Sequence, residues 1–383
     1  MLVTRRKKVM LAFGTRPEAI KMAPVYQELL ARLHMFEPVC CVTAQHRQML
    51  DQVLETFRMV PDIDLDLMRA GQDLTDVTAA VLNAMRTVLR EEKPDVVLVH
   101  GDTTTTMATT MAAFYAEVPV GHVEAGLRTF DMRAPFPEEF NRRLTGMLAR
   151  YHFAPTETSK ANLLREACDP DAIVVTGNTV IDALQFILRR IEAEPAARAA
   201  INGELDAVMG FDWRSERYVL ITGHRRENFG VGFEQICAAL GELSDAFPDV
   251  HFVYPVHLNP NVRGPVNALL AGRDNVHLIE PLTYEPFLYA LQHCYLVLTD
   301  SGGIQEEAPS LGKPVLVMRD VTERPEAVDA GTVRLVGANR ANIVAGVAGL
   351  LSDAALHARM SAAHNPYGDG HAARRIVDFL EQN

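Results

Sequence analysis

Charged and polar residues gather where short apolar runs of the sequence end. The turn Phe13-Gly14-Thr15-Arg16-Pro17-Glu18 follows such a run, and Lys21 comes little more than one helical turn after Arg16. Thr15 and Glu18 have the spacing of a capping box, so we expect a helix to begin here. Free N–H groups and the helix dipole favour an anion at such an N-terminus. A phosphate contact for Arg16 is therefore predicted, beside the simpler alternative of a well-capped helix.

A second turn of this kind is Asp300-Ser301-Gly302-Gly303-Ile304-Gln305-Glu306-Glu307, which follows the apolar run Tyr295–Thr299. Ser301 can cap a helix, and the adjacent glycines let backbone N–H groups approach a diphosphate closely. Glu307, one turn further, is placed to accept both ribose hydroxyls. The alternative is a serine-capped turn whose glutamates serve only the helix dipole. The cluster His224-Arg225-Arg226 also follows a predicted strand and adds potential positive charge at the same sheet edge.

Three carboxylates form the third candidate group. Asp102 follows the run Val96–His100, Glu124 closes the run Val120–Glu124, and Glu138 lies in a proline-rich turn. Any one of them can have a local role, and Asp102 before four threonines is a candidate helix N-cap. Acid–base catalysis, however, needs carboxyl groups whose surroundings separate their pKa values. We therefore predict that the three acids converge opposite the anion site.

Composition restricts the classes of partner. The 37 basic and 49 acidic residues give a net charge of −12, which argues against nucleic acid and against an anionic membrane surface. The five cysteines include no C-x-x-C pair, so we predict neither a disulfide framework nor a metal site. Neither a P-loop nor a G-x-G-x-x-G turn occurs, and no nicotinamide cofactor is expected. The apolar run Val9–Phe13 is too short for a signal peptide, so we expect a cytoplasmic protein.

The positions of these residues require a regular α/β framework. Apolar runs alternate with segments of helical spacing, such as Ile20–Leu33 and Thr75–Glu91, which is typical of a doubly wound parallel sheet. The rhythm breaks near residues 191–213 and then restarts. We therefore predict two Rossmann-like domains facing a common cleft, residues 7–180 with a returning helix at 367–383, and residues 181–366. The expected strands are Val9–Phe13, Val39–Thr43, Val96–His100, Val120–Glu124, Tyr151–Ala154, Ile173–Thr176, Tyr218–Thr222, His251–Pro255, Val276–Ile279, Tyr295–Thr299 and Pro314–Met318.

Taken together, the motifs resemble one known family, the non-hydrolysing UDP-N-acetylglucosamine 2-epimerases of bacteria. The resemblance runs from about Val9 to the final helix, with the motifs in order. It is carried by the segments Phe13–Pro24, Val99–Asp102, Gly121–Arg128, Gly223–Glu227, Asp300–Glu307 and Glu323–Glu326.

The resemblance implies a GT-B architecture, with the C-terminal helix crossing back to the first domain, and a homodimer. It implies that UDP-N-acetylglucosamine is the substrate and that Asp102, Glu124 and Glu138 are catalytic, with His224 beside the diphosphate. The implied substrate-binding residues are Arg16, Lys21, Leu282, Phe287, Ser301, Gly302, Gly303, Glu307 and Arg324. A second, activating substrate site would involve Gln45, His46, Gln48 and Gln72, for which an ordinary polar loop and turn is the alternative.

The implied reaction inverts carbon 2 of the sugar by elimination of UDP to 2-acetamidoglucal and re-addition, and its product would serve cell-surface polysaccharide synthesis. The carbon 2 proton is not adjacent to a carbonyl, so expulsion of UDP from carbon 1 makes its removal feasible. Three alternatives remain open from sequence: a hydrolysing epimerase that releases UDP, a GT-B glycosyltransferase, and a catalytically silent nucleotide-sugar sensor. Which carboxylate removes the proton is not assigned.

Overall fold

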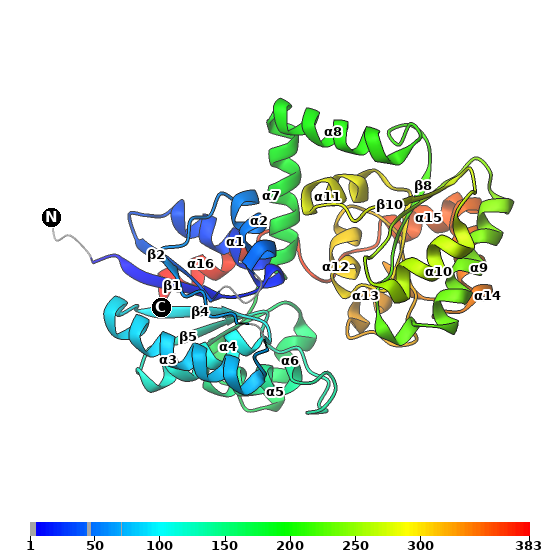
Figure 1. Cartoon of the computed structure of the whole chain (residues 1–383). Helices are drawn as coiled ribbons and strands as arrows, with labels where there is room; N and C mark the ends of the chain where they lie inside the picture. The colour runs from blue at the N-terminus through cyan, green and yellow to red at the C-terminus, as the bar shows by residue number, and fades with distance from the viewer. Residues whose placement is uncertain (1–4, 44–46, 70) are drawn as a thin grey trace. The chain divides into compact units, whose positions relative to one another are not determined.

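The computed structural model describes residues 5–43, 47–69 and 71–383, with only the backbone given for residues 47–49. The chain divides into two compact units, which are described separately (Figure 1). Unit 1 comprises Met1–Gln185 and Tyr367–Asn383, and unit 2 comprises Phe186–Pro366. Helix α7 (Thr179–Ala193) runs through the division between the units, so it also contains the boundary predicted at residues 180 and 181.

Unit 1 is built on a parallel sheet of seven strands in the order β3-β2-β1-β4-β5-β6-β7 (Figure 1). Strand β1 pairs with β2 on one side and β4 on the other, so that Met10 lies beside Val39 and Val97. Helices cover both faces of the sheet, and Val9–Phe13 are therefore buried along their whole length. The strands are β1 (Lys7–Phe13), β2 (Phe36–Val42), β3 (Ile63–Asp64), β4 (Val96–His100), β5 (Val120–Val123), β6 (Tyr151–Ala154) and β7 (Ile173–Val175).

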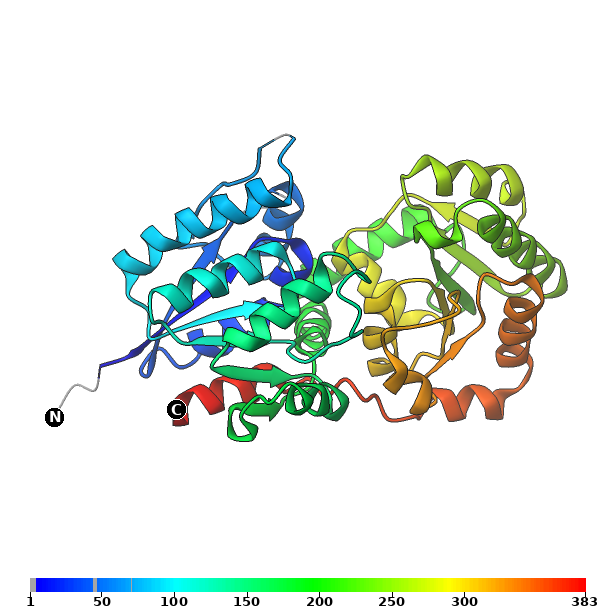
Figure 2. The same cartoon turned by 90° about the horizontal axis from the view of Figure 1, so that it is seen from below.

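The C-terminal helix α16 packs on unit 1, although it is the last element of the chain (Figure 2, red). The ring of Phe379 lies edge-on to Tyr151 and Phe153, and Arg32, in the turn after α1, pairs with Asp378 at 2.6 Å. The predicted return of the last helix to the first domain is confirmed. The helices of unit 1 are α1 (Arg16–Leu30), α2 (Arg47–Thr56), α3 (Leu74–Glu92), α4 (Thr104–Tyr115), α5 (Glu138–Leu148), α6 (Glu157–Arg165), the start of α7, and α16 (Ala372–Gln382), with a 3₁₀ turn η1 (Pro170–Ala172).

Unit 2 repeats the same plan with a parallel sheet of six strands in the order β10-β9-β8-β11-β12-β13. The strands are β8 (Tyr218–Thr222), β9 (His251–Pro255), β10 (Val276–Ile279), β11 (Leu296–Thr299), β12 (Val315–Val317) and β13 (Val333–Leu335). The helices are α8 (Pro195–Met209), α9 (Val231–Ala246), α10 (Pro260–Leu270), α11 (Tyr284–His293), α12 (Gly302–Ser310), α13 (Pro325–Asp329), α14 (Arg340–Ser352) and α15 (Ala354–Ser361), with a 3₁₀ turn η2 (Arg226–Asn228). Both units are Rossmann-like, as predicted.

In each sheet the strand order reverses at one point, between β1 and β4 in unit 1 and between β8 and β11 in unit 2. Open α/β sheets bind their ligands at the carboxyl ends of the strands beside such a reversal. Arg16 and Asp102 follow β1 and β4, while His224 and Ser301 follow β8 and β11. The topology therefore places the predicted residues of each unit at the expected binding edge of its sheet.

Within the described residues, no single helix is long and apolar enough to cross a membrane. The adjacent pair α14 and α15, bent by 96° between them, meets the length and composition criteria only when both helices are taken together.

Candidate active site

The first turn of unit 1 is organised by the carboxylate of Glu18. Helix α1 begins at Arg16 with Thr15 as its N-cap and a complete capping box, as the spacing predicted. Glu18 Oε2 accepts the N–H groups of Gly14 at 3.0 Å and Thr15 at 2.7 Å, which leaves half-buried Arg16 at the helix N-terminus. The arrangement leaves an anion contact available at Arg16.

The other oxygen of Glu18 joins this turn to the next loop of the sheet. Glu18 Oε1 accepts the hydroxyl protons of Thr103 at 2.6 Å and Thr106 at 3.1 Å. Glu18 is 1% exposed, so four donors compensate the burial of its charge. The sequence indicated the capping role of Glu18 but not that it connects the Arg16 turn to the Asp102 loop.

Asp102 lies in the loop after β4 and does not cap α4. The N-cap is Thr103, whose hydroxyl accepts the N–H of Thr106, so the capping alternative for Asp102 is wrong. The Asp102 side chain is 31% exposed and lies 3.1 Å from Nη2 of Arg142 in α5. Burial raises the pKa of Asp102 to about 6, since the charge of Arg142 offsets it only in part and the charges of Glu124 and Glu138 add to it.

Glu124 follows β5 and is 10% exposed. Its carboxylate forms a close ion pair with Lys21 of α1. It also accepts a hydrogen bond from Nδ2 of Asn178 at 2.8 Å. His100 Nε2 lies 3.6 Å from the same oxygen. Burial by itself raises the pKa of Glu124, but the charges and hydrogen bonds of Lys21 and His100 outweigh it and hold the pKa well below its usual range.

The backbone at Glu124 adopts the left-handed conformation, with φ at 63°, which is unfavourable for a residue with a side chain. Glu124→Ala and Glu124→Gly both remove the carboxylate, but only glycine relieves this conformation. We expect the glycine variant to have a free energy of unfolding about 0.5–1 kcal/mol above that of the alanine variant. Urea unfolding of both variants provides the measurement, and equal stabilities would show that the backbone relaxes at no cost.

Glu138 is the first residue of α5 and completes the cluster of acids. Its Oε2 is buried and has no hydrogen-bond partner among the residues that the structure describes. Its charge, like that of Glu124, acts on Asp102. The structure therefore brings the predicted acids Asp102, Glu124 and Glu138 together, with Lys21 beside them, and separates the pKa values of Asp102 and Glu124.

In unit 2, Asp300 holds the loop that carries His224. Asp300 is fully buried, and its Oδ2 accepts the N–H groups of His224 at 2.9 Å and Arg225 at 2.8 Å. His224 is 45% exposed at this edge, with Nδ1 3.4 Å from Asp300 Oδ1. Burial lowers the pKa of His224, and the charge of Asp300 opposes this only in part. The imidazole of His224 is therefore favoured in its neutral form in the ligand-free protein, and its ring N–H can donate to a diphosphate.

The glycine turn after β11 leads directly into α12. Ser301 occupies the N-cap position but makes no side-chain capping bond, so the predicted capping by its hydroxyl is wrong; its N–H instead donates to Thr299 Oγ1 at 2.9 Å. A Cβ at Gly302 would lie 2.5 Å from Nη1 of Arg324, so the guanidinium group lies close against this glycine. Arg324 Nε in turn donates to buried Glu306 at 2.7 Å. Arg324 thus lies against the first residue of α12.

The predicted uridine contacts lie on α12 and in or just before α11. Glu307, 7% exposed, lies on α12, and Tyr284 Oη is 3.5 Å from its Oε1. Leu282 precedes α11, Phe287 lies in the first turns of that helix, and both are half-buried. Tyr284, between them, was not predicted as a site residue.

Of the predicted effector residues, Gln45 and His46 lie outside the described residues. Gln48 lies in α2, where only the backbone is described. The amide of Gln72 closes a local turn, since its Oε1 accepts the Arg69 N–H at 2.6 Å and its Nε2 donates to Leu67 O at 3.2 Å.

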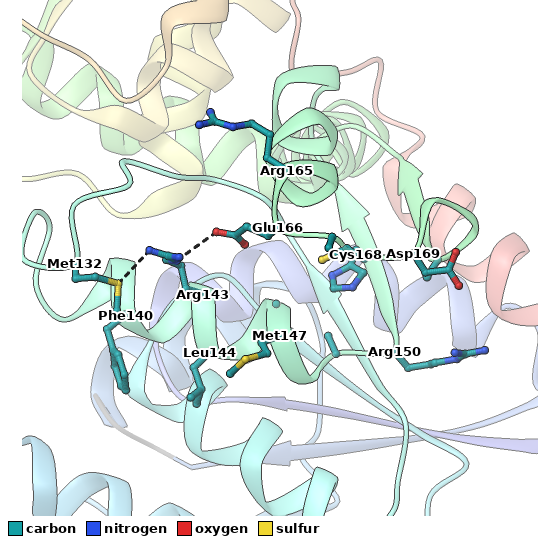
Figure 3. Close-up of a pocket in the computed structure, with 15 residues that line it drawn as sticks. Met132, Phe140, Arg143, Leu144, Met147, Arg150, Arg165, Glu166, Cys168 and Asp169 are labelled. Carbon is teal, nitrogen blue, oxygen red and sulfur yellow. Dashed lines mark hydrogen bonds and ion pairs between the residues drawn. The ribbon is translucent and has the colours of Figure 1, made fainter.

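A cavity of about 850 Å³ in unit 1 contains none of the predicted residues. In Figure 3, Arg143 lies between Met132 and Glu166, with Phe140, Met147 and Arg150 along the wall. Arg150 and Ala172 immediately precede β6 and β7, so the cavity reaches the amino ends of these strands, away from the carboxylate cluster. Among the described residues, no group of three or more His, Cys, Asp or Glu side chains is placed to hold a metal ion.

Two Rossmann-like units, one with clustered carboxylates and one with a glycine turn beside a histidine, define a nucleotide-sugar enzyme of the GT-B class. The chain belongs to the UDP-N-acetylglucosamine 2-epimerase family, whose sequence profile matches residues 28–381. It is 58% identical over 376 residues to the UDP-N-acetylglucosamine 2-epimerases of Yersinia pestis and Escherichia coli K12, covering 98% of this chain and 99% of each relative. The crystal structure of the Neisseria meningitidis epimerase bound to UDP-GlcNAc matches with a TM-score of 0.89 and 50% identity, over 98% of this chain and all of the other.

Proposed function

We propose that the protein interconverts UDP-N-acetylglucosamine and UDP-N-acetylmannosamine by inverting carbon 2, without hydrolysis. Membership of the family supports the substrate. The observation that carries the chemistry is the carboxylate cluster of unit 1, in which Glu124 is held ionised while the pKa of neighbouring Asp102 is raised to about 6. Two acids with separated pKa values suit a reaction that removes a proton and returns one.

In the proposed reaction, a carboxylate takes the carbon 2 proton. The electron pair of the C–H bond forms the C1=C2 double bond of 2-acetamidoglucal, and the C1–O bond breaks with its electrons going to the diphosphate of UDP. Re-addition of UDP and delivery of a proton to the opposite face complete the inversion. We assign UDP to Arg16, His224, the Ser301–Gly303 turn and Glu307, and the lining of the active site to Lys21 and Arg324. Leu282 and Phe287 are assigned to the uracil.

Solvent exchange provides the test. In D₂O, ¹H NMR of the recovered sugar nucleotides is expected to show deuterium at carbon 2 in both epimers, with no lasting accumulation of UDP. A hydrolysing enzyme would instead accumulate UDP and free N-acetylmannosamine, and a glycosyltransferase would release UDP only with an acceptor. Retention of protium at carbon 2 in a converting enzyme would refute the elimination mechanism.

We also propose the activating substrate site near α2. Its polar residues Gln45, His46, Gln48 and Gln72 support this assignment, although the bonds of Gln72 also suit a purely local turn. Initial rates are expected to rise sigmoidally with UDP-N-acetylglucosamine and to lose this shape in Gln45→Ala. A hyperbolic curve that Gln45→Ala leaves unchanged would remove the site.

The family further supports a cytoplasmic homodimer whose product enters cell-surface polysaccharide synthesis. We propose the domain roles accordingly, with the carboxylates in residues 7–180 and UDP held by residues 181–366. Light scattering of the purified chain tests the dimer.

A further inference from the structure

The donors around Glu124 all act on one of its two oxygens. Lys21 Nζ and Asn178 Nδ2 both donate to Oε2, and His100 Nε2 lies 3.6 Å from that same atom. No hydrogen bond to Oε1 comes from the described residues. One oxygen of the carboxylate is therefore occupied and the other is available to a reacting proton.

Asn178 is fixed more firmly than its place in a loop before α7 would suggest. It is 3% exposed, and its N–H donates to the carbonyl of Tyr367 at 2.7 Å. Its Oδ1 accepts the N–H of Val180 at 3.0 Å. Because the oxygen of the amide is engaged there, the NH₂ group must be the end that faces Glu124.

We propose that Asn178 is a positioning residue for the epimerisation, which holds Glu124 so that its Oε1 takes the carbon 2 proton. Asn178 touches the carboxylate through Oε2 and acts on the reaction only through it. The inference rests on the proposed function, because the proton that Glu124 removes belongs to that reaction. Glu124 thereby becomes the proton acceptor of the elimination step, and the C–H electron pair leaves through carbon 1 with UDP.

The groups that face Glu124 determine how a change at Asn178 will act. They are Lys21 of α1, His100 of β4 and Asp102, whose negative charge repels that of Glu124. Replacing the neutral Asn178 by aspartate sets a second carboxylate against Oε2. Two carboxylates in hydrogen-bonding contact share a proton, which raises the pKa of one of them strongly.

Asn178→Asp tests the proposal, because aspartate keeps the size and the helix-capping oxygen of asparagine and changes only the group facing Glu124. We expect kcat at pH 7 to fall at least about 100-fold, with KM nearly unchanged, because proton transfer contributes this much. The acid limb of the kcat profile should move up by about 1 pH unit or more. The matched control is Asn339→Asp at the N-cap of α14 in unit 2, where Oδ1 accepts the Asn342 N–H at 3.0 Å; its kinetics should match the wild type.

A wild-type kcat and pH profile in folded Asn178→Asp would overturn the proposal, as would a loss of kcat matched by an equal rise in KM. If Asn178→Asp fails to fold, Asn178→Ser replaces it, since serine caps a helix but is too short to reach Oε2. It should lose at least about tenfold in kcat, and wild-type turnover in it overturns the proposal. An experiment on the wild-type enzyme in D₂O separates the proposed function from the proposed role of Asn178. If the wild type incorporates deuterium at carbon 2, the proposed function stands, whatever the Asn178 variants show.

Discussion

Replacing Asp102 by asparagine is expected to lower kcat for the interconversion by about 10²–10⁴-fold, because an amide can neither take up nor deliver a proton. The side chain keeps its shape, and Asn141 Nδ2 still donates to the Asp102 carbonyl at 2.9 Å, so the loop after β4 should remain in place. UDP binding, which we assign mainly to groups of unit 2, should be unchanged by calorimetry. The kinetic loss should therefore appear in kcat rather than in the affinity for UDP.

The same variant is expected to be more stable than the wild type at pH 7. The pKa of Asp102 is raised from 3.8 to about 6, so the folded protein holds this proton more tightly than the unfolded chain. The contribution of the Asp102 carboxyl to the free energy of unfolding is therefore most favourable below pH 4 and is lost as the pH rises from 4 to 6. Asparagine has no such dependence. With allowance for the solvent that reaches the side chain, the variant should gain about 1 kcal/mol above pH 6 and nothing below pH 4.

Urea unfolding at pH 4 and pH 7 measures that gain, and it separates lost chemistry from misfolding. Asp95→Asn is the matched control at the amino end of the same strand, where Asp95 Oδ2 accepts the Lys8 N–H at 2.7 Å. It should retain wild-type kcat. An Asp102→Asn variant within tenfold of the wild-type kcat would show that Asp102 transfers no proton in the rate-limiting step.

Much of the framework follows from the sequence because buried parallel strands are continuous apolar runs. Strands β4, β6 and β9, for example, have the predicted bounds Val96–His100, Tyr151–Ala154 and His251–Pro255. The strands that were not predicted lack such a run: β3 is two residues long, and β13 carries Arg334 between Val333 and Leu335. Edge strands of this kind are defined by their pairing partners rather than by their own composition.

The site was predictable only in part, for a related physical reason. Residues at the ends of strands could be placed at the sheet edge from the alternation of elements alone. Their partners could not, because Asn178 meets Glu124 across 54 positions of sequence and Arg142 reaches Asp102 from another helix. The alternative of capping by Asp102 fails because Thr103, one residue later, has the extended backbone and the hydroxyl that α4 uses.

Unit 2 offers the second large effect, at the buried carboxylate of Asp300. Asp300→Ala would leave the N–H groups of His224 and Arg225 without the acceptor that now holds them at 2.9 and 2.8 Å. A buried donor left in this way costs about 1–3 kcal/mol, and these two donors are only partly buried, so we expect the free energy of unfolding to fall by about 2 kcal/mol. The loop carrying His224 would also lose its connection to the turn at Ser301, and UDP affinity should fall at least about tenfold.

Asp300→Asn distinguishes the hydrogen bonds from the charge. Both backbone donors reach the same atom, Oδ2, so a single amide oxygen can accept both. The remaining oxygen, Oδ1, has no hydrogen bond in the described structure and lies 3.4 Å from His224 Nδ1, so an NH₂ group can replace it and donate to the neutral imidazole. Calorimetry with UDP and urea unfolding should therefore place asparagine near the wild type and alanine far below it. If asparagine is as damaging as alanine, the negative charge of Asp300, rather than the geometry it imposes, is what the UDP site requires.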